Sequence, residues 1–569
     1  MSAFRSPRWS TIVQQLASNW VLCGFLFALA LCFNLYRLGN PGIWFDEAFS
    51  VGLAQQSFPL LWHIIFGLEP NMELYYLFLH TWLGVTALFG LHPTEFVVRL
   101  PSTIFAASST VALFLLGRRF LGLLPGLIGA GLYLLNDLQL VYAQQARSFS
   151  LQLFLLCVAW YAFLASLTGE SHQKRWWLCF TLTTSLAIYA HLFSLIILLA
   201  QLCAFGLLLI LPGPWCAKAK RQMTSFLISL VVIATLIIPL LPVSLQGPKT
   251  GWLSIPQLKD IPRLFLTISG NNKLYLLMLA TCCLAVLVVA VQSYLRAGKL
   301  PFINAAKWRP AHTKLHSTNT LEMDHTGSPT QKGHHPQKGG PSTRCNDLQQ
   351  FLPIVLTLLC WLVVPITVSY LISQGSLRLF SSRYLVTIVP PLLLLVGLGI
   401  SSLRWQLLQI MLVLGIFTLA LYAVPYYYRS AQVEDWNRAS FWVEQHYQSG
   451  DGLVCYDNAT QQGCQVSLEY YLQAYPGAAH FSADAPGAFS WASFGSANPD
   501  AAINPTVLEV FATKHPHIFF IVGRLPNNMA VLQARYAQSW LDKHYHFVAQ
   551  MVTRTVSVRL YTTALPSHN

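Results

Sequence analysis

Long runs of apolar residues recur through the first three quarters of the chain and constrain its fold more than any other feature. A bilayer core is about 30 Å thick, so a helix that crosses it needs about 20 mostly apolar residues. Such windows lie at 20–36, 99–117, 122–141, 150–168, 176–190, 191–211, 225–245, 274–296, 352–374, 384–400 and 405–425. Because 54% of the residues are hydrophobic and 10% are charged, the sequence predicts an all-α polytopic membrane protein with about eleven transmembrane helices.

The basic residues indicate how these helices are oriented. The formal net charge is +14, but the basic residues form no single patch, which argues against nucleic acid as a partner. Lys and Arg near span ends remain in the cytosol. With eleven spans the following all fall on that side: Arg5, Arg8, Arg118, Arg119, Lys174, Arg175, Lys218, Lys220, Arg221, Arg404 and the insert after Arg296.

One further apolar stretch, residues 74–90, is short for a span and contains His80. If it crossed the membrane, Arg118 and Arg119 would face outward. We therefore expect an interfacial helix with Tyr75, Tyr76 and Trp82 at head-group depth. The alternative is a twelfth span, which would invert the topology of everything that follows it.

Composition divides the chain into a membrane module, residues 1–428, and a C-terminal domain. The module contains a long outer loop at 37–98 and a hydrophilic insert at 297–350, which is rich in Gly, Pro, Ser, Lys and His. We expect this insert to be a disordered cytosolic linker. The first apolar window is long and no small-residue cleavage site follows it, so we expect a signal anchor.

Residues 429–569 have the pattern of a small α/β domain outside the cytoplasm. A helical pattern extends to about Tyr447, and the later segments predict buried strands in "LVCY" and "HIFFIV", an amphipathic helix in "VLQARYAQSWLDKHY" and a hairpin in "FVAQMVTRTVSVRLY". Cys455 and Cys464 are the only two of the twelve cysteines in this domain. Outside the cytoplasm they can form a disulfide.

The expected topology brings side chains of both charges to the outer ends of the spans. They are Asp46, Glu47, Glu69, Glu73, Arg99, Gln144, Gln145, Arg147, Tyr189, His191, Arg378, Arg383 and Tyr384. Ionisable groups in membrane helices usually face a cavity or an interface, because a charge at mid-bilayer costs about 2.5–3.5 kcal/mol. A carboxylate can accept the proton of an attacking hydroxyl, and arginines can bind a departing phosphate. This combination predicts group transfer from a lipid-linked phosphate to a hydroxyl.

Structural explanations and other functions stand beside this one. Asp46 and Glu47 begin a helical pattern, where the helix dipole favours acidic residues. Arg99, Arg378 and Arg383 can extend to lipid head groups. A transporter or flippase of lipid-linked sugars also has many spans and charged cavities, although no internal repeat is evident. A scaffold without activity is a third alternative.

At these motifs the sequence resembles the GT-C membrane glycosyltransferases of the protein O-mannosyltransferase and aminoarabinose transferase type, glycosyltransferase family 39. The resemblance runs through nearly the whole chain and rests on "WFDEAFS", "EPNMELYYLFLH", "VVRLPS", "GRRFLG", "LVYAQQARSFSL", "IYAHLFSL", "SSRYL" and "EDWNRASFWV" in this order. It implies a GT-C fold and inverting transfer of a monosaccharide, with mannose suggested, from a polyprenyl-phosphate-linked donor. The acceptor is a protein, lipid or glycan hydroxyl. The small outer domain and the lack of a visible retrieval signal favour a bacterial plasma membrane.

The resemblance also assigns roles to individual residues. Asp46 matches the catalytic acidic position and would act as general base, with Glu47 as its neighbour. Glu69 matches a second acidic position, although "EPNMELYY" keeps only Pro70 where many relatives have two prolines. Arg383 resembles a contact to the lipid phosphate. Substrate-binding candidates are Glu69, Arg99, Gln145, Arg147, Tyr189, His191, Arg378, Arg383 and Tyr384. No cofactor is predicted with certainty, but some relatives hold a divalent metal at the positions of Glu69 and His191.

Overall fold

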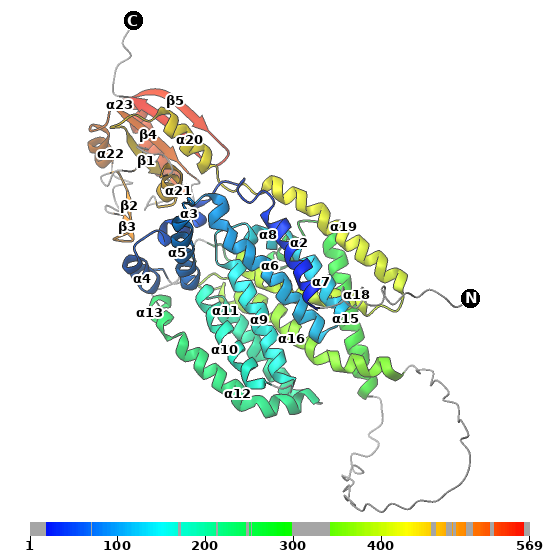
Figure 1. Cartoon of the computed structure of the whole chain (residues 1–569). Coiled ribbons are helices and arrows are strands. Elements are labelled where there is room, and N and C mark those ends of the chain that lie inside the picture. The colour runs from blue at the N-terminus through cyan, green and yellow to red at the C-terminus, as the bar shows by residue number, and fades with distance from the viewer. Residues whose placement is uncertain are drawn as a thin grey trace, which may run out of the picture.

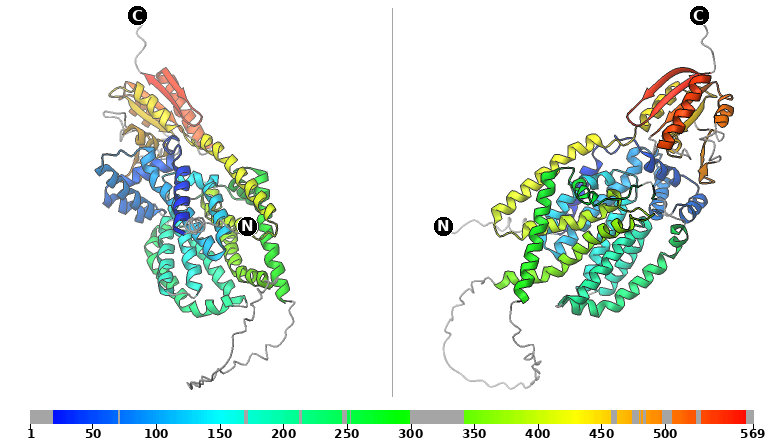
Figure 2. Two further views of the ribbon diagram at one scale, coloured as in Figure 1. Left: turned by 45° about the vertical axis from the view of Figure 1, so that its right-hand side comes forward. Right: turned by 180° about the vertical axis from the view of Figure 1, so that it is seen from behind.

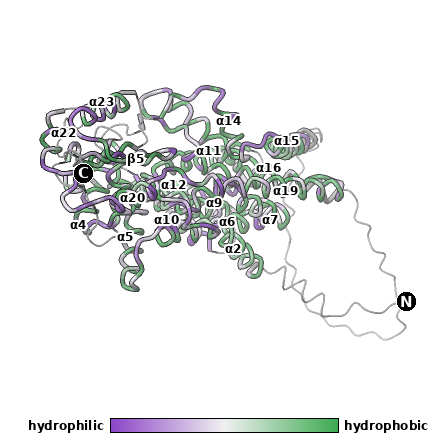
Figure 3. The backbone as a smooth tube through the Cα atoms, turned by 90° about the horizontal axis from the view of Figure 1, so that it is seen from above, coloured by the Kyte–Doolittle hydropathy of each residue, from purple (hydrophilic) through white to green (hydrophobic). Residues whose placement is uncertain are grey.

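The computed structural model describes residues 19–69, 71–168, 172–211, 214–245, 250–251, 253–298, 342–456, 462–473, 479, 481, 485–496, 505–523 and 528–562. Figure 1 shows its helices gathered in one bundle, with a small domain containing a sheet at one end. Figure 3 shows that hydrophobic residues predominate along bundle helices such as α7 and α19, whereas α23 of the small domain is largely hydrophilic. The predicted fold class, a helical membrane module followed by a small α/β domain, is confirmed.

The bundle contains every apolar window that the sequence predicts as a span. Its helices are α2 (Asn19–Leu35), α6 (Glu95–Phe120), α7 (Leu123–Leu134), α8 (Asp137–Ala143), α9 (Phe149–Leu167), α10 (Gln173–Ala190), α11 (Ser194–Ile210), α12 (Pro214–Leu236), η1 (Ile238–Leu240), α13 (Leu241–Ser244), α14 (Asp260–Ile268), α15 (Lys273–Gly298), α16 (Ser342–Ile372), α17 (Ser382–Leu385), η2 (Val386–Ile388), α18 (Val389–Ser401) and α19 (Gln406–Ser430). Helix α16 therefore begins inside the segment predicted as a linker. Residues 299–341 of that segment lie outside the described residues.

Seven helices in the described part of the chain are long and apolar enough to cross a membrane. An eighth span is formed if α7 and α8, which are bent by 61° relative to each other, count as one. Helices α2 and α11 have 17 residues each and are shorter than this criterion requires. The chain is thus an integral membrane protein, and the count of eleven spans stays a prediction.

The outer loop folds into three short helices, α3 (Phe45–Ala54), α4 (Phe58–Gly67) and α5 (Glu73–Leu88). Helix α5 covers most of the ambiguous segment 74–90. Its 16 residues span about 24 Å at 1.5 Å per residue, less than the bilayer core. In Figures 1 and 2 the three helices lie at the end of the bundle nearest the sheet domain. The interfacial location of α5 stays a prediction.

Small residues allow three of the bundle helices to approach closely. A Cβ atom added to Gly117 of α6 would lie 2.7 Å from the Cα atom of Gly126 in α7. A Cβ atom on Gly397 of α18 would lie 2.6 Å from the carbonyl oxygen of Pro125. Such contacts are typical of membrane helices, because glycine lets two backbones pack directly together. They fix α6, α7 and α18 to one another at the end of α6 that is away from the outer loop.

The C-terminal domain contains a four-stranded sheet of order β1-β4-β6-β5. Its elements are α20 (Trp436–His446), β1 (Gly452–Tyr456), α21 (Gln462–Leu472), α22 (Pro505–Ala512), β4 (His517–Val522), α23 (Asn528–His544), β5 (His546–Val552) and β6 (Ser557–Thr562), with the pair β2 (Phe489–Ser490) and β3 (Gly495–Ser496) apart. Strands β1 and β4 are parallel, and β5 and β6 form the predicted antiparallel hairpin. Cys455 and Cys464 form the predicted disulfide.

Alternate residues of β1 and β4 face two separate cores, as expected for strands that are covered by helices on both faces of the sheet. Leu453 and Phe519 pack with α20 and α21, whereas Val454 and Phe520 pack with α22 and α23. The domain is fixed to the membrane module through α21 and the outer loop. Tyr471 accepts a hydrogen bond from the Ile43 backbone N–H at 2.6 Å and donates one to Glu95 at 2.9 Å. The sheet domain thus holds the segment that leads into α3.

Candidate active site

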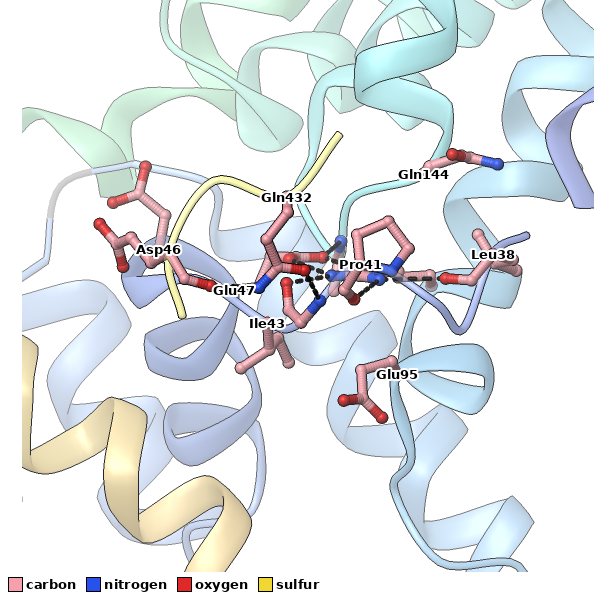
Figure 4. A network of polar contacts seen from close by, with 12 residues as sticks. Leu38, Pro41, Ile43, Asp46, Glu47, Glu95, Gln144 and Gln432 are labelled. Carbon is pink, nitrogen blue, oxygen red and sulfur yellow. Dashed lines mark hydrogen bonds and ion pairs between the residues drawn. The ribbon is translucent and has the colours of Figure 1, made fainter. Parts of the chain in front are cut away.

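Helix α3 directs the two adjacent carboxylates, Asp46 and Glu47, to different sides of the helix. The chain is extended at Trp44 and becomes helical at Phe45, which places both acids in the first turn. Successive residues of a helix point about 100° apart, since one turn takes 3.6 residues. Figure 4 shows the result, because the dashed polar contacts converge beside Glu47 and Asp46 lies away from them.

Glu47 is completely buried in an ion pair with Arg99. The Nε and Nη2 atoms of Arg99 donate to its two carboxylate oxygens at 2.8 and 2.7 Å, and the Ala146 backbone N–H donates at 2.7 Å. Arg99 also donates to the carbonyl oxygens of Leu38 and Pro41, at 3.0 and 2.7 Å. Exposure is 0% for the Glu47 side chain and 2% for that of Arg99. The pair therefore joins α3, α6, the loop before α3 and the segment between α8 and α9, without a surface for substrate.

Asp46 is partly exposed and lies between two arginines. Its Oδ2 atom is 3.2 Å from Nη1 of Arg383 and 3.6 Å from Nη2 of Arg147. Arg147 also donates to the Asp46 carbonyl oxygen at 3.1 Å and to the Ser50 hydroxyl at 3.2 Å. The guanidinium of Arg383 lies over the Trp44 ring, 5.8 Å from its centre. One accessible carboxylate and two cations from three distant segments thus meet at one point.

Several other predicted residues surround this ion cluster. The His191 ring lies 5.2 Å from that of Tyr384, and electrostatic interactions link Tyr384 to Asp46, Glu69 and both arginines. Gln145 is half-buried, and its Oε1 atom has no hydrogen-bond partner among the described residues. These residues can contact a molecule bound beside Asp46.

The ring of His191 is already engaged by its neighbours. Its Nδ1 atom accepts the Phe193 backbone N–H at 3.1 Å, and its Nε2 atom lies 3.3 Å from Nδ2 of Asn71. Within the described residues, no group of three or more His, Cys, Asp or Glu side chains could hold a metal ion. Glu69 and His191 therefore do not fit a metal site with three or more such ligands, and we derive no chemical step through a metal.

Two predicted residues are directed elsewhere. Arg378 donates to the Leu253 carbonyl oxygen at 2.8 Å, and the Tyr189 hydroxyl donates to that of Leu236 at 2.7 Å. No interaction in the described part of the chain joins either of them to Asp46. Tyr189 thus connects α10 to the end of α12, and Arg378 connects the loop before α17 to the loop before α14.

Tyr76 and Glu73 of α5 also belong to this region, although sequence reasoning gave neither of them a role in the site. The Tyr76 hydroxyl is buried without a hydrogen-bond partner among the described residues, and it interacts electrostatically with Arg147, Glu69 and Asp46. Both Glu73 carboxyl oxygens are likewise buried and make no hydrogen bond to another described residue. Burial raises the pKa of Glu73 to about 8; its own backbone N–H opposes this and the charge of Glu69 adds to it. Glu73 and Tyr76 are three residues apart in "ELYY" and therefore lie on one face of the helix. This spacing is the sequence signal that could have assigned them to the site.

The chain has the fold of the GT-C membrane proteins. ArnT from Cupriavidus metallidurans, solved bound to undecaprenyl phosphate, is similar over 97% of this chain and 99% of its own, with a TM-score of 0.51 and 12% sequence identity. The oligosaccharyltransferase of Archaeoglobus fulgidus in complex with Zn and sulfate is similar over 95% of this chain and 73% of its own, with a TM-score of 0.48 and 10% identity. No protein-family model and no curated protein matches the sequence. The likeness to ArnT shows a shared fold and confirms the GT-C fold expected from the sequence.

Proposed function

We propose that this protein is a membrane glycosyltransferase that moves a monosaccharide from a polyprenyl-phosphate-linked donor to an acceptor hydroxyl. The observation that carries the proposal is the accessible Asp46 carboxylate between Arg147 and Arg383. The undecaprenyl phosphate bound to ArnT, which has the same fold, supports a lipid phosphate as part of the donor.

The geometry suggests how the charges act in sequence. The donor phosphate binds Arg147 and Arg383, whose guanidinium groups then neutralise it instead of Asp46. Asp46, released from its ion pairs, accepts the proton of the acceptor hydroxyl. The acceptor oxygen forms a bond to the anomeric carbon from the face opposite the phosphate, and the bond to the phosphate oxygen breaks. Transfer therefore inverts the anomeric centre, and the two arginines stabilise the leaving phosphate.

The other residues have supporting roles in this proposal. Glu47 and Arg99 hold the loop, because neither has exposed surface from which to reach a substrate. Gln145, Tyr384, His191 and Glu69 contact the sugar or the acceptor. We place the site and the sheet domain outside the cytoplasm of a bacterium, at the plasma membrane, since this orientation leaves the basic loops in the cytosol.

The test is release of polyprenyl phosphate by the purified protein in lipid vesicles. Polyprenyl-phosphate mannose is the first donor, followed by other sugars, each with protein, lipid and glycan acceptors. We expect release by the wild type and by Asp542→Asn, a matched control whose partly exposed carboxylate pairs with Arg559 in the sheet domain. Asp46→Asn should release polyprenyl phosphate about 10²–10⁴-fold more slowly. Release by Asp46→Asn at the wild-type rate would show that Asp46 is not the general base. Movement of the donor across the vesicle membrane without release of polyprenyl phosphate would favour a flippase.

A further inference from the structure

A groove of about 620 Å³ lies between the ends of α2 and α19 that are nearest the C-terminal domain. Figure 1 shows the two helices running toward that domain. Their ends meet through Tyr36 and Tyr428, whose ring centres are 4.9 Å apart. The Tyr428 hydroxyl also donates to the Phe33 carbonyl oxygen. The groove is therefore a feature of two helices that are fixed to each other, rather than a gap between loose ones.

The lining of the groove is apolar on its walls and positively charged at its end. Phe33, Val424 and Pro425 contribute apolar surface, while Arg37 and Arg429 supply two guanidinium groups. None of the described residues that line it is acidic. Both arginines are exposed, and neither forms an ion pair with any residue that the structure describes. The combination is complementary to a molecule with an anionic head and an apolar tail.

We propose that this groove binds an anionic phospholipid from the leaflet nearest the C-terminal domain, with its phosphate between Arg37 and Arg429 and an acyl chain along Phe33 and Val424. Basic pockets between membrane helices bind anionic lipid head groups, because arginine forms strong charge-assisted hydrogen bonds to phosphate oxygens. The pair of Tyr36 and Tyr428 fits this assignment, because tyrosine side chains favour the boundary between head groups and acyl chains.

The position of the groove favours a bilayer phospholipid over the glycosyl donor. Gln144 donates to the carbonyl oxygens of Asn34 and Tyr36 at 2.8 Å each, next to the groove. Three residues later Arg147 contacts Asp46. The segment from Gln144 to Arg147 thus lies between the groove and the candidate active site, so a lipid phosphate in the groove is not placed to react there. Lipid binding at this groove consequently does not depend on the proposed function.

Occupancy of the groove should also stabilise the segment that carries Arg147. The Tyr427 hydroxyl donates to Oε1 of Gln144 at 3.0 Å, while Gln144 holds the end of α2. A lipid that bridges α2 and α19 therefore restrains both partners of Gln144. This coupling predicts that an anionic lipid raises the melting temperature of the whole protein.

The experiment measures lipid retained by the full-length protein after reconstitution with phosphatidylcholine and phosphatidylglycerol and re-purification, quantified by mass spectrometry. We expect phosphatidylglycerol to be enriched on the wild type. Retention should fall about fivefold for Arg37→Gln or Arg429→Gln alone and about thirtyfold for both together, because each cation near a membrane surface contributes about a fivefold factor in anionic-lipid affinity. Arg438→Gln, an exposed arginine in α20, is the matched control and should retain the lipid.

Two further variants keep the test informative if the glutamine variants fold poorly. The double lysine variant keeps both charges and should retain most of the lipid. Cys32→Trp places a bulky ring in the groove while leaving both arginines, and it should remove the lipid and its effect on the melting temperature. Equal retention by the wild type, the double glutamine variant and Cys32→Trp would overturn the proposal. Displacement of phosphatidylglycerol by polyprenyl phosphate at a low molar ratio would overturn the assignment to a phospholipid and make the groove a carrier-lipid site.

Discussion

Two ion clusters built around consecutive residues have opposite environments in this protein. Glu47 and Arg99 form a buried, bidentate pair with no exposed surface. One residue earlier, Asp46 is 19% exposed and interacts with Arg147 and Arg383 at longer distances of 3.6 and 3.2 Å. The same residue types thus have two roles. The buried cluster fixes the loop, whereas the arginines of the open cluster can bind a ligand in place of Asp46. Substitutions in the two clusters should therefore affect different properties.

The largest expected effect is on turnover by Asp46→Asn. Asparagine keeps the size of the side chain but cannot accept the proton of the acceptor hydroxyl, so turnover should fall by about 10²–10⁴-fold. The melting temperature should fall less than in Glu47→Gln, because Asp46 is partly exposed and its ion pairs with Arg147 and Arg383 are longer than the pair between Glu47 and Arg99. Initial rates of polyprenyl phosphate release and thermal unfolding in detergent measure the two properties. A variant that keeps its rate but unfolds early would place Asp46 with Glu47 as a structural residue.

Glu47→Gln should have the next largest effect, and that effect should be on stability. Removing one partner leaves the guanidinium of Arg99 buried without its countercharge, which costs about 3–5 kcal/mol. We expect a markedly lower melting temperature and reduced yield. The double variant Glu47→Leu with Arg99→Met removes both charges and should recover part of the loss. Full activity and an unchanged melting temperature in Glu47→Gln would contradict the separation of the two clusters.

The sequence predicts the presence of both clusters but not their separation. Apolar windows, basic loops and the outer carboxylates suffice for a helical membrane module with an acidic loop, because each depends on local composition. The direction of Asp46 and Glu47 depends instead on where α3 begins and on a guanidinium 52 positions away in the chain. The same limit explains Arg378 and Tyr189, whose partners are backbone carbonyls that no sequence pattern identifies.

Arg383→Ala tests whether the open cluster binds phosphate. Loss of one of two cations that stabilise the leaving phosphate should lower turnover by about 10²–10³-fold. Arg383→Lys keeps the charge without the bidentate geometry and should recover part of the activity. Arg404→Ala, an exposed arginine before α19, is the control and should be as active as the wild type. Wild-type turnover by Arg383→Ala, with binding of the lipid donor unchanged, would remove Arg383 from the site.

The smallest effect concerns Glu73, which lies beside the open cluster but is buried like Glu47. Burial raises its pKa from 4.5 in a free side chain to about 8, so the folded protein favours the neutral acid. Above pH 4.5 the unfolded chain releases this proton while the folded protein retains it, and stability falls with rising pH until about pH 8. Each pH unit in this window should lower the free energy of unfolding by about 1 kcal/mol.

The variant Glu73→Gln stays neutral at every pH. Its melting temperature should therefore fall less between pH 5 and 8 than that of the wild type. The exposed Glu509→Gln should follow the wild type. Parallel profiles for all three proteins would show that Glu73 is ionised in the folded state and belongs with the charges around Asp46.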